Sequence, residues 1–244
     1  MSQPTWILLC ARTARSIAYL QALAASGLQP SAVIVYGEQK KSISSSRNIH
    51  VQHFHDLFCP DLLVDLDQWL IQQEWSCYYN NNSDLNSATL HAYLTSLTPD
   101  LIVYSGYGGQ LVPSELLALA PVLHVHSGWL PDYRGSTTLY YQVIDQGFCS
   151  ASALLLDEKI DTGPVLLRKN YPLPPAGVDV DYLYDNAIRA DLLVIAINQW
   201  LQVGCMNSVI SQTGFQQPYY IIHPLLKHLA VLSIDKNEVL HECE

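Results

Sequence analysis

Two histidines separated by one residue form the most chemically informative feature of this sequence. His124 and His126 stand at the end of an apolar run, and a loop containing glycine and proline follows them. Residues i and i+2 of a strand point to the same face, so both imidazoles can meet one ligand. In open α/β sheets, ligands lie just beyond the carboxyl ends of the strands. A lone histidine is more often structural, but a pair at this position favours acid–base chemistry on a substrate.

The second informative segment is the turn at 157–163, which reads DEKIDTG. It places Asp157, Glu158 and Asp161 close together in the chain. A carboxylate beside an imidazole stabilises its protonated form, and it can orient the ring or exchange a proton with it. The segment is also typical of a solvated hairpin turn in which Asp and Gly supply the turn geometry. The residues alone leave both interpretations open.

The elements that must position these residues follow a strand–helix–strand order. Continuous apolar runs at 5–11, 32–36 and 100–105 are typical of strands buried on both faces, and the Ala- and Leu-rich segment 13–26 is typical of a helix. This order implies an α/β fold, with a mostly parallel sheet and helices on both faces. The further expected elements are helices at 61–73, 84–97, 113–119, 136–146 and 179–201, and strands at 122–125, 149–156 and 165–171.

Proline and glycine between Pro172 and Gly177 mark the expected edge of the sheet domain. We therefore expect a catalytic domain at 1–172 and a small C-terminal helical extension at 173–244. After the first expected strand the sequence reads CARTARS, which lacks the nucleotide fingerprint GxGxxG. The sheet is thus expected to be Rossmann-like without binding NAD.

The charge balance disfavours one large class of partner. The formal net charge is −10, from 12 basic and 22 acidic residues. Nucleic acids are bound mainly by clustered Lys and Arg side chains, and the sequence contains no such cluster. We therefore expect no nucleic-acid partner, which disfavours a tRNA substrate.

Cysteine spacing and apolar runs indicate the compartment. The six cysteines show no CxxC spacing, so neither a structural zinc site nor a disulfide framework is expected, and free thiols suit a reducing compartment. No basic residue precedes the apolar run 6–11, which is unlike a secretory signal. The run 192–197 is far too short to span a bilayer. We expect a soluble, cytoplasmic protein that does not bind a membrane.

Taken together, these segments resemble the formyltransferases that use 10-formyltetrahydrofolate and act on methionyl-tRNA, glycinamide ribonucleotide or amino sugars linked to nucleotides. That family has a strand-end motif N-x-H, then Leu-Pro and an aromatic residue with Arg-Gly, and later a turn of the form D-E-x-[IL]-D-[TG]-G. Here Leu130-Pro131, Tyr133-Arg134-Gly135 and the turn 157–164 match it. The loop 105–113, SGYGGQLVP, resembles the family's folate-contacting loop. The resemblance covers roughly residues 1–172.

The resemblance implies formyl transfer from 10-formyltetrahydrofolate to a primary amine of a small molecule, such as an amino sugar nucleotide or an amino acid derivative. His126 would assist proton transfer as the amine attacks the formyl carbon, and Asp161 would orient and polarise that imidazole. The residues implied to contact the folate are Tyr107, Gly108, Gly109, Gln110, Leu111, Leu156, Asp157 and Ile160. Those implied to contact the amine substrate are Tyr133, Arg134 and Thr137.

The sequence departs from the family at His124, where the motif has asparagine. The family's asparagine donates its amide N–H to the oxyanion of the tetrahedral intermediate, a type of stabilisation that is often the largest in catalysis. An imidazole can also donate an N–H, but it is bulkier and titrates near neutral pH. His124 is therefore expected to be catalytic with an altered role.

Two alternatives remain open. The first is the same fold with folate-independent chemistry at His124, His126 and Asp161, which would be hydrolysis, another acyl transfer or an intramolecular cyclisation. The second is a metal-dependent hydrolase in which these residues bind zinc. No further ligand cluster is evident in the sequence, so we expect no metal. The apolar segment from Tyr219 to Leu232 is compatible with a homodimer contact or with packing on the sheet.

Overall fold

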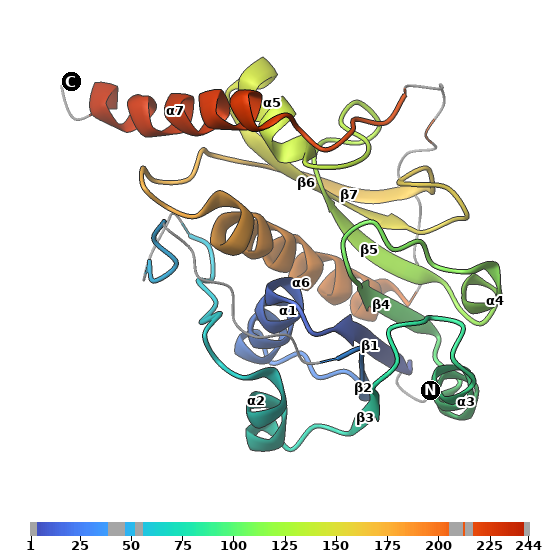
Figure 1. Ribbon diagram of the computed structural model, residues 1–244. Coiled ribbons are helices and arrows are strands. Elements are labelled where there is room, and N and C mark those ends of the chain that lie inside the picture. Colours follow the sequence, from blue (N-terminus) through green and yellow to red (C-terminus); the bar gives the residue numbers. More distant parts are fainter. Residues whose placement is uncertain (1–3, 39–46, 52–55, 205–211, 213–216, 242–244) are drawn as a thin grey trace.

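The computed structural model describes residues 4–38, 47–51, 56–204, 212 and 217–241, with side chains placed as far as residue 236. Its centre is a seven-stranded sheet with the strand order β3-β2-β1-β4-β5-β6-β7 (Figure 1). The strands are β1 (Trp6–Ala11), β2 (Ala32–Tyr36), β3 (Cys77–Asn80), β4 (Leu101–Ser105), β5 (Val122–Ser127), β6 (Cys149–Leu155) and β7 (Val165–Tyr171). The pairs among β1 to β5 are parallel, whereas β6 is antiparallel to both β5 and β7. The expected mostly parallel, Rossmann-like sheet is confirmed.

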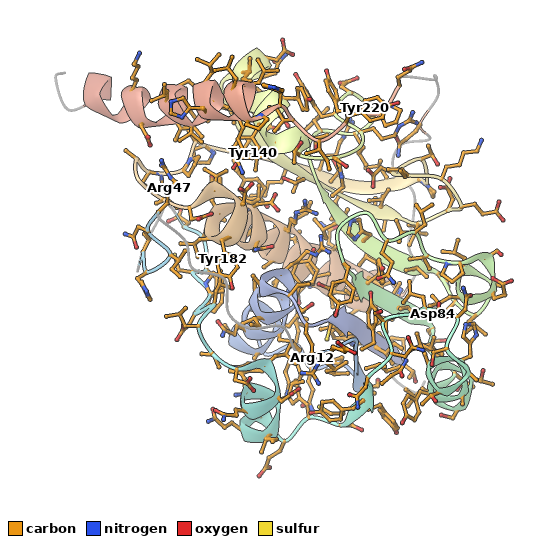
Figure 2. All side chains as sticks on the ribbon, viewed as in Figure 1. Arg12, Arg47, Asp84, Tyr140, Tyr182 and Tyr220 are labelled. Atoms are coloured by element: carbon orange, nitrogen blue, oxygen red, sulfur yellow. The ribbon has the colours of Figure 1, made fainter. Side chains whose placement is uncertain are left out.

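Helices cover both faces of this sheet, as expected. They are α1 (Ala14–Ala25), α2 (Leu66–Gln73), α3 (Ala88–Leu97), α4 (Ser114–Leu117), α5 (Thr138–Gln146), α6 (Asp185–Val203) and α7 (Pro224–His241), with a π-helical turn at Val180–Tyr184 leading into α6. The core residues of α1 and α6 form one cluster with one set of strand side chains. Those of α3 and α4 form a second cluster with the opposite set. Figure 2 shows the side chains between the helices and the sheet.

The alternation along β1 explains why its sequence is apolar throughout. Leu8 and Cys10 belong to the cluster with α1 and α6, and Ile7 and Leu9 belong to the cluster with α3 and α4. All four side chains are fully buried. A strand covered on both faces has no polar side, so its hydrophobic run is continuous.

Strand β3 was not expected from the sequence. Its segment, CYYN, is short, and only Asn80 is buried. The strand lies at the edge of the sheet and pairs in parallel with β2, with Val33 opposite Cys77 and Tyr36 opposite Asn80. An edge strand needs little apolar surface, so periodicity gave no signal here, and the pairing with β2 defines the strand.

The helix α6 connects the expected C-terminal extension to the sheet. It packs against α1 and against β5, β6 and β7, and Leu193 and Ile197 are fully buried in the same cluster as β1. The helix α7 packs beside α5 (Figure 1). The division at residues 172 and 173 stays a prediction, to which we return below. Across the described part of the chain, no helix is both long and apolar enough to cross a membrane.

Candidate active site

A cavity of about 480 Å³ opens where β4 and β5 end and β6 continues into the acidic turn. Parallel strands bring their carboxyl ends to one edge, which is why residues far apart in the sequence meet there. The cavity is lined by Arg15, Tyr104, Tyr107, Gly108, Gly109, Gln110, Leu111, Val112, His124, His126, Gly135, Ser136, Thr137, Leu156, Asp157, Lys159, Ile160, Asp161, Arg189 and Ile221. This lining includes every residue expected to be catalytic or to contact the folate, and it also includes Thr137.

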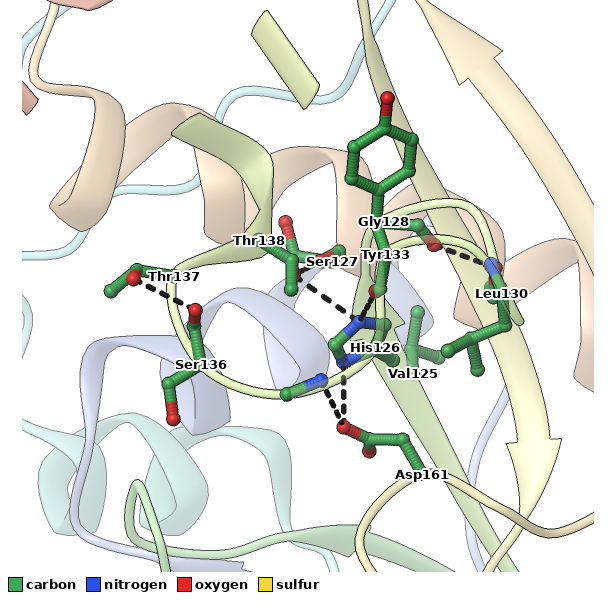
Figure 3. A network of polar contacts seen from close by, with 12 residues as sticks. Val125, His126, Ser127, Gly128, Leu130, Tyr133, Ser136, Thr137, Thr138 and Asp161 are labelled. Carbon is green, nitrogen blue, oxygen red and sulfur yellow. Dashed lines mark hydrogen bonds and ion pairs between the residues drawn. The ribbon is translucent and has the colours of Figure 1, made fainter. Parts of the chain in front are cut away.

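The imidazole of His126 is held at both ring nitrogens (Figure 3). The residue is only 4% exposed. Nε2 lies 2.7 Å from the backbone oxygen of Tyr133 and 3.2 Å from Oγ1 of Thr138, and Nδ1 lies 3.4 Å from Oδ2 of Asp161. Because a carbonyl oxygen only accepts hydrogen bonds, Nε2 carries a proton. The structure therefore brings the expected histidine and carboxylate together, with the ring in a defined orientation.

Asp161 is positioned by a tightly constrained turn. Its backbone has a positive φ of 52°, and the residue is 8% exposed. Its Oδ2 accepts the backbone N–H of Gly135 at 3.2 Å, and its backbone oxygen accepts Nε2 of Gln212 at 3.0 Å. At Gly163 a Cβ atom would lie 1.9 Å from the backbone oxygen of Leu155, so this turn position requires glycine. The turn is thus more than a solvated hairpin.

His124 has a different hydrogen-bonding pattern from His126. It is half-buried, and its Nδ1 lies 3.3 Å from the backbone oxygen of Tyr104, so the proton is on Nδ1. Burial, followed by the positive charges of Arg15 and Arg189, holds the pKa of His124 well below 6.5. The ring is therefore neutral at pH 7. Among the described residues Nε2 has no hydrogen-bond partner, so it presents a lone pair rather than an N–H.

The residues expected to bind the amine separate into two groups. Thr137 lines the cavity, whereas Tyr133 and Arg134 do not. The hydroxyl of Tyr133 donates to Asp145, and its ring stacks on Tyr219 with the centroids 5.9 Å apart. Tyr133 contributes to the site through its backbone oxygen, which orients His126.

The structure adds two arginines to the site that the sequence analysis did not assign. Arg15 lies in the first turn of α1, and its guanidinium donates to the backbone oxygen of Gly106. Arg189 lies on α6, where Nη1 donates to the backbone oxygen of Val125 at 2.8 Å and Nε donates to Asp185 at 2.9 Å. For Arg15, its position just after the first strand was the only feature of the sequence that could have indicated a place at the site. Arg189 lies far from the motifs along the chain, and only the packing of α6 brings it to the cavity.

A segment near the C-terminus also contributes to the site. The N–H of Tyr219 donates to the backbone oxygen of Arg134 at 2.7 Å, and the N–H of Ile222 donates to Oγ1 of Thr137 at 2.8 Å. Ile221, between them, lines the cavity. These bonds fix the loop that carries Gly135, so the expected extension shapes the pocket.

The alternative of a metal-dependent hydrolase gains no support from this arrangement. Within the described ranges, no group of three His, Cys, Asp or Glu side chains is arranged to hold a metal ion. Nδ1 of His124 faces the oxygen of Tyr104, and Nε2 of His126 faces that of Tyr133. These ring nitrogens are directed toward separate protein partners.

Comparison with known families agrees with this geometry. The model of the formyl transferase family matches residues 7–192, which span the sheet and the first part of α6. The chain belongs to the formyl transferase family. This confirms the resemblance that the motifs around His126 and Asp161 indicated.

Among curated relatives, the methionyl-tRNA formyltransferase of Nitratiruptor sp. is 38% identical over 85 residues, which is 34% of this chain and 28% of that protein. The methionyl-tRNA formyltransferase of Trichlorobacter lovleyi is 35% identical over 105 residues, which is 41% of this chain and 33% of that protein. The matched segment therefore spans about a third or less of these relatives' lengths.

Solved structures show the same fold. A sugar N-formyltransferase from a Shewanella species superposes with a TM-score of 0.57 at 15% identity, covering 94% of this chain and 87% of that one. Glycinamide ribonucleotide transformylase 1 from Symbiobacterium toebii gives 0.56 at 16% identity, covering 83% and 90%. A formyltetrahydrofolate deformylase from Pseudomonas syringae pv. tomato also gives 0.56 at 16% identity, covering 83% and 62%.

Proposed function

We propose that this protein transfers a formyl group from 10-formyltetrahydrofolate to a primary amine of a small molecule. The observation that carries the proposal is the single cavity in which His124, His126 and Asp161 meet the loop 107–111 and the turn 156–161. Its volume of about 480 Å³ lies in the usual range for small-molecule sites. This constellation brings a proton acceptor, a histidine–carboxylate pair and the expected folate-contacting segments to one cavity.

The cavity has a wall suited to a flat, polar-edged ring such as a pterin. Gly108 and Gly109 have no side chains, and a Cβ atom at either would meet nothing within 4 Å, so backbone groups are accessible there. Leu111 and Ile160 line the cavity although they are 58% and 47% exposed. Apolar side chains exposed at a cavity favour contact with a ligand ring. When bound, the donor supplies a formyl group on nitrogen that is activated toward amines.

His124 is suited to take a proton from the attacking amine. Nucleophilic attack forms a bond from the amine nitrogen to the formyl carbon, and this nitrogen must then lose a proton. The neutral imidazole of His124 has its proton on Nδ1 and a lone pair on Nε2, so it can act as the acceptor. This role differs from the oxyanion donor that the family motif implies at this position.

His126 and Asp161 are suited to supply a proton to the nitrogen that leaves the formyl carbon. The departing nitrogen must gain a proton as its bond to the formyl carbon breaks. The carboxylate of Asp161 faces Nδ1 of His126 at 3.4 Å and can hold or pass a proton there. The contact of Nε2 with Tyr133 keeps the ring from rotating. Asp161 thus orients the ring of His126, and the pair holds a proton that can be passed to the departing nitrogen.

The amine is proposed to be small because the chain has a formal net charge of −10. This net charge would repel a polyanionic tRNA. The segment Tyr219–Ile222 also lies against the loop 134–137, where it limits the amine side of the cavity.

Hydrolysis of the formyl donor is a second candidate, and the neutral base at His124 is the observation that favours it. A lone pair that can deprotonate an amine can also deprotonate water. The deformylase from Pseudomonas syringae shows that the fold is compatible with this outcome. Release of formate in the absence of any amine would favour hydrolysis over transfer.

The test is turnover of 10-formyltetrahydrofolate by the purified protein, with and without a panel of primary amines. Formylated amine, tetrahydrofolate and formate are each quantified by mass spectrometry. Asp161→Asn removes the carboxylate beside His126 at constant shape, and we expect kcat to fall by about 10²- to 10⁴-fold.

The matched control is Glu158→Gln. This residue is exposed on the same turn and does not line the cavity, so the variant should retain wild-type turnover. Turnover by Asp161→Asn near the wild-type rate would contradict the assigned site. Absence of binding of the stable analogue 5-formyltetrahydrofolate would contradict the proposed donor.

A further inference from the structure

Two arginine side chains lie on the wall of the cavity that also holds His124. Arg15 comes from α1 and Arg189 from α6, and these helices pack against each other. We propose that Arg15 and Arg189 form a binding site for an anionic group, a carboxylate or a phosphate, carried by the amine substrate. The inference rests on the proposed transfer to an amine, because it assigns the chemistry of that amine.

Among the described residues, only one of the two arginines has a carboxylate partner. The guanidinium of Arg189 is paired with Asp185 at 2.9 Å. Arg15 donates to neutral oxygens, which are Oγ of Ser105 at 3.4 Å and the backbone oxygen of Gly106. Within the described part of the chain, no carboxylate lies within ion-pair distance of Arg15. Despite burial, the charge of Asp185 raises the pKa of Arg189, so the excess positive charge is that of Arg15.

Such an excess is costly inside a protein unless a ligand neutralises it. Burial, and then the nearby charge of Arg189, lowers the pKa of Arg15 from its ordinary value. Neutral acceptors replace only part of the solvation that a partly buried cation loses, and an anion replaces more of it. The whole chain is acidic, with a formal net charge of −10, so this local positive field is a distinct feature of the site.

The carboxylates of the cavity do not supply that anion. Oδ2 of Asp161 faces Nδ1 of His126 and accepts the N–H of Gly135. Asp157 accepts the hydroxyl of Thr162 at 2.6 Å on the exposed turn. Both acidic side chains are engaged by other groups. A guanidinium matches the planar, two-oxygen edge of a carboxylate or phosphate, so the chemical class of the ligand follows.

The arginines share the cavity wall with His124, which supports assigning the anion to the amine, although Arg15 also contacts Gly106 next to the folate loop. Both guanidinium charges act on His124, whose lone pair is proposed to accept the proton of the amine. The folate loop at 107–111 and the turn at 156–160 form another part of the lining. An amine whose anionic end is bound by Arg15 and Arg189 would have its nitrogen directed to the His124 side.

The variant that tests the proposal is Arg15→Gln, with Arg12→Gln as its matched control. Arg12 lies in the same segment after β1 and loses the same charge, but it does not line the cavity and instead pairs with Asp67 at 2.6 Å. The probe is inorganic phosphate, titrated into each protein by calorimetry. We expect binding to wild type, a loss of about 10- to 100-fold in Arg15→Gln, and no change in Arg12→Gln, as for the loss of one charge-assisted hydrogen bond.

Four further measurements separate the possible outcomes. Binding of 5-formyltetrahydrofolate should be equal in wild type, Arg15→Gln and Arg12→Gln. The ratio of kcat/KM for β-alanine to that for its primary amide should exceed about 10 and fall toward 1 in Arg15→Gln, chiefly through KM. Thermal melts establish that each variant is folded, and Arg15→Lys, which keeps the charge, should retain more phosphate affinity than Arg15→Gln.

Absence of phosphate binding to wild type, or equal binding to Arg15→Gln, would overturn the anion site. Weaker binding of the folate analogue to Arg15→Gln would overturn the assignment to the amine and place the anion on the donor. Failure of wild type to bind the folate analogue would contradict the proposed function, while the phosphate titration would still decide the anion site.

Discussion

The chemistry at the residue scale is determined by which ring nitrogen of each histidine carries a proton. Carbonyl oxygens of Tyr104 and Tyr133 each accept one imidazole N–H, from Nδ1 of His124 and Nε2 of His126 respectively. The remaining nitrogen of His126 faces Asp161, and that of His124 presents a lone pair. Two neighbouring histidines on one strand face therefore differ in which ring nitrogen carries the proton, because their backbone acceptors differ.

The lowered pKa of His124 predicts how stability depends on pH. In the unfolded chain a histidine titrates near pH 6.5, whereas in the folded protein burial and two arginines keep His124 neutral to well below that value. Its contribution to stability is therefore complete above about pH 6.5 and is lost as the pH falls toward the folded pKa. The slope attributable to this group reaches about 1.4 kcal/mol per pH unit.

The measurement is the free energy of unfolding in urea at several pH values between 5 and 7.5. His124→Gln should flatten the decline below pH 6.5. His228→Gln removes an exposed histidine on α7 and should leave the decline as in wild type. An unchanged pH dependence in His124→Gln would show that His124 is not held neutral by its surroundings.

At the scale of elements, the active-site loop depends on a segment distant in sequence. The backbone of Tyr219 bridges to Gly135, and both its N–H and its oxygen bond to the loop 134–136. Gly135 has a φ of 111°, and a Cβ atom there would lie 2.3 Å from the backbone oxygen of Tyr219. The close approach of two backbones is possible because residue 135 has no side chain.

Gly135→Ala is therefore expected to destabilise the protein by about 1–3 kcal/mol and to displace the segment that holds Ile221 in the cavity. The control is Gly147→Ala, which has a similar left-handed φ of 72° but an open space around the added Cβ. That variant should cost only about 1 kcal/mol. Urea unfolding measures both, and equal costs would contradict the role of the Tyr219 contact.

On the scale of the whole molecule, α6 connects the sheet to the C-terminal part. Leu193 is fully buried between α6 and the sheet in the same cluster as Leu8 and Leu20. The family match also continues to residue 192, beyond the expected boundary at 172. The cooperativity of unfolding tests whether the expected extension is a separate unit.

Leu193→Ala should lower the free energy of unfolding by about 2–5 kcal/mol, because it leaves a cavity in the shared core. Circular dichroism and tryptophan fluorescence should show one coincident transition that moves as a whole to lower urea. Leu225→Ala, on the exposed side of α7, should change stability by less than about 0.5 kcal/mol. Two separate transitions, with only one shifted, would instead support a domain boundary near residue 172.

At the scale of the whole molecule, the net charge also predicts that the protein does not bind tRNA. With a formal charge of −10 the protein should not bind tRNA at about 150 mM salt, which a gel mobility-shift assay measures. A single-stranded DNA-binding protein of basic charge is a suitable positive control. Tight binding with a steep salt dependence would contradict the proposed restriction to small amines.

The sequence by itself determined much of the fold and indicated the residues that meet in the cavity. Strands such as β1 are buried on both faces, so they require continuous apolar runs that are visible without a structure. The histidine spacing placed two imidazoles on one face at a strand end, and the pattern of the turn at 157–163 indicated Asp161. These features are local, and local sequence determines them.

The tertiary structure alone decided the tautomers of the two histidines and the pKa of His124. The tautomer of His124 depends on a carbonyl of the neighbouring strand, at Tyr104, and its pKa depends on Arg15 and Arg189 from two different helices. The short edge strand β3 likewise depends on its pairing with β2. These hydrogen-bond partners and charges come from residues far apart in the sequence, which only the packing of the fold brings together. For this reason the sequence identified the histidine pair, and the fold determined which nitrogen is free to react.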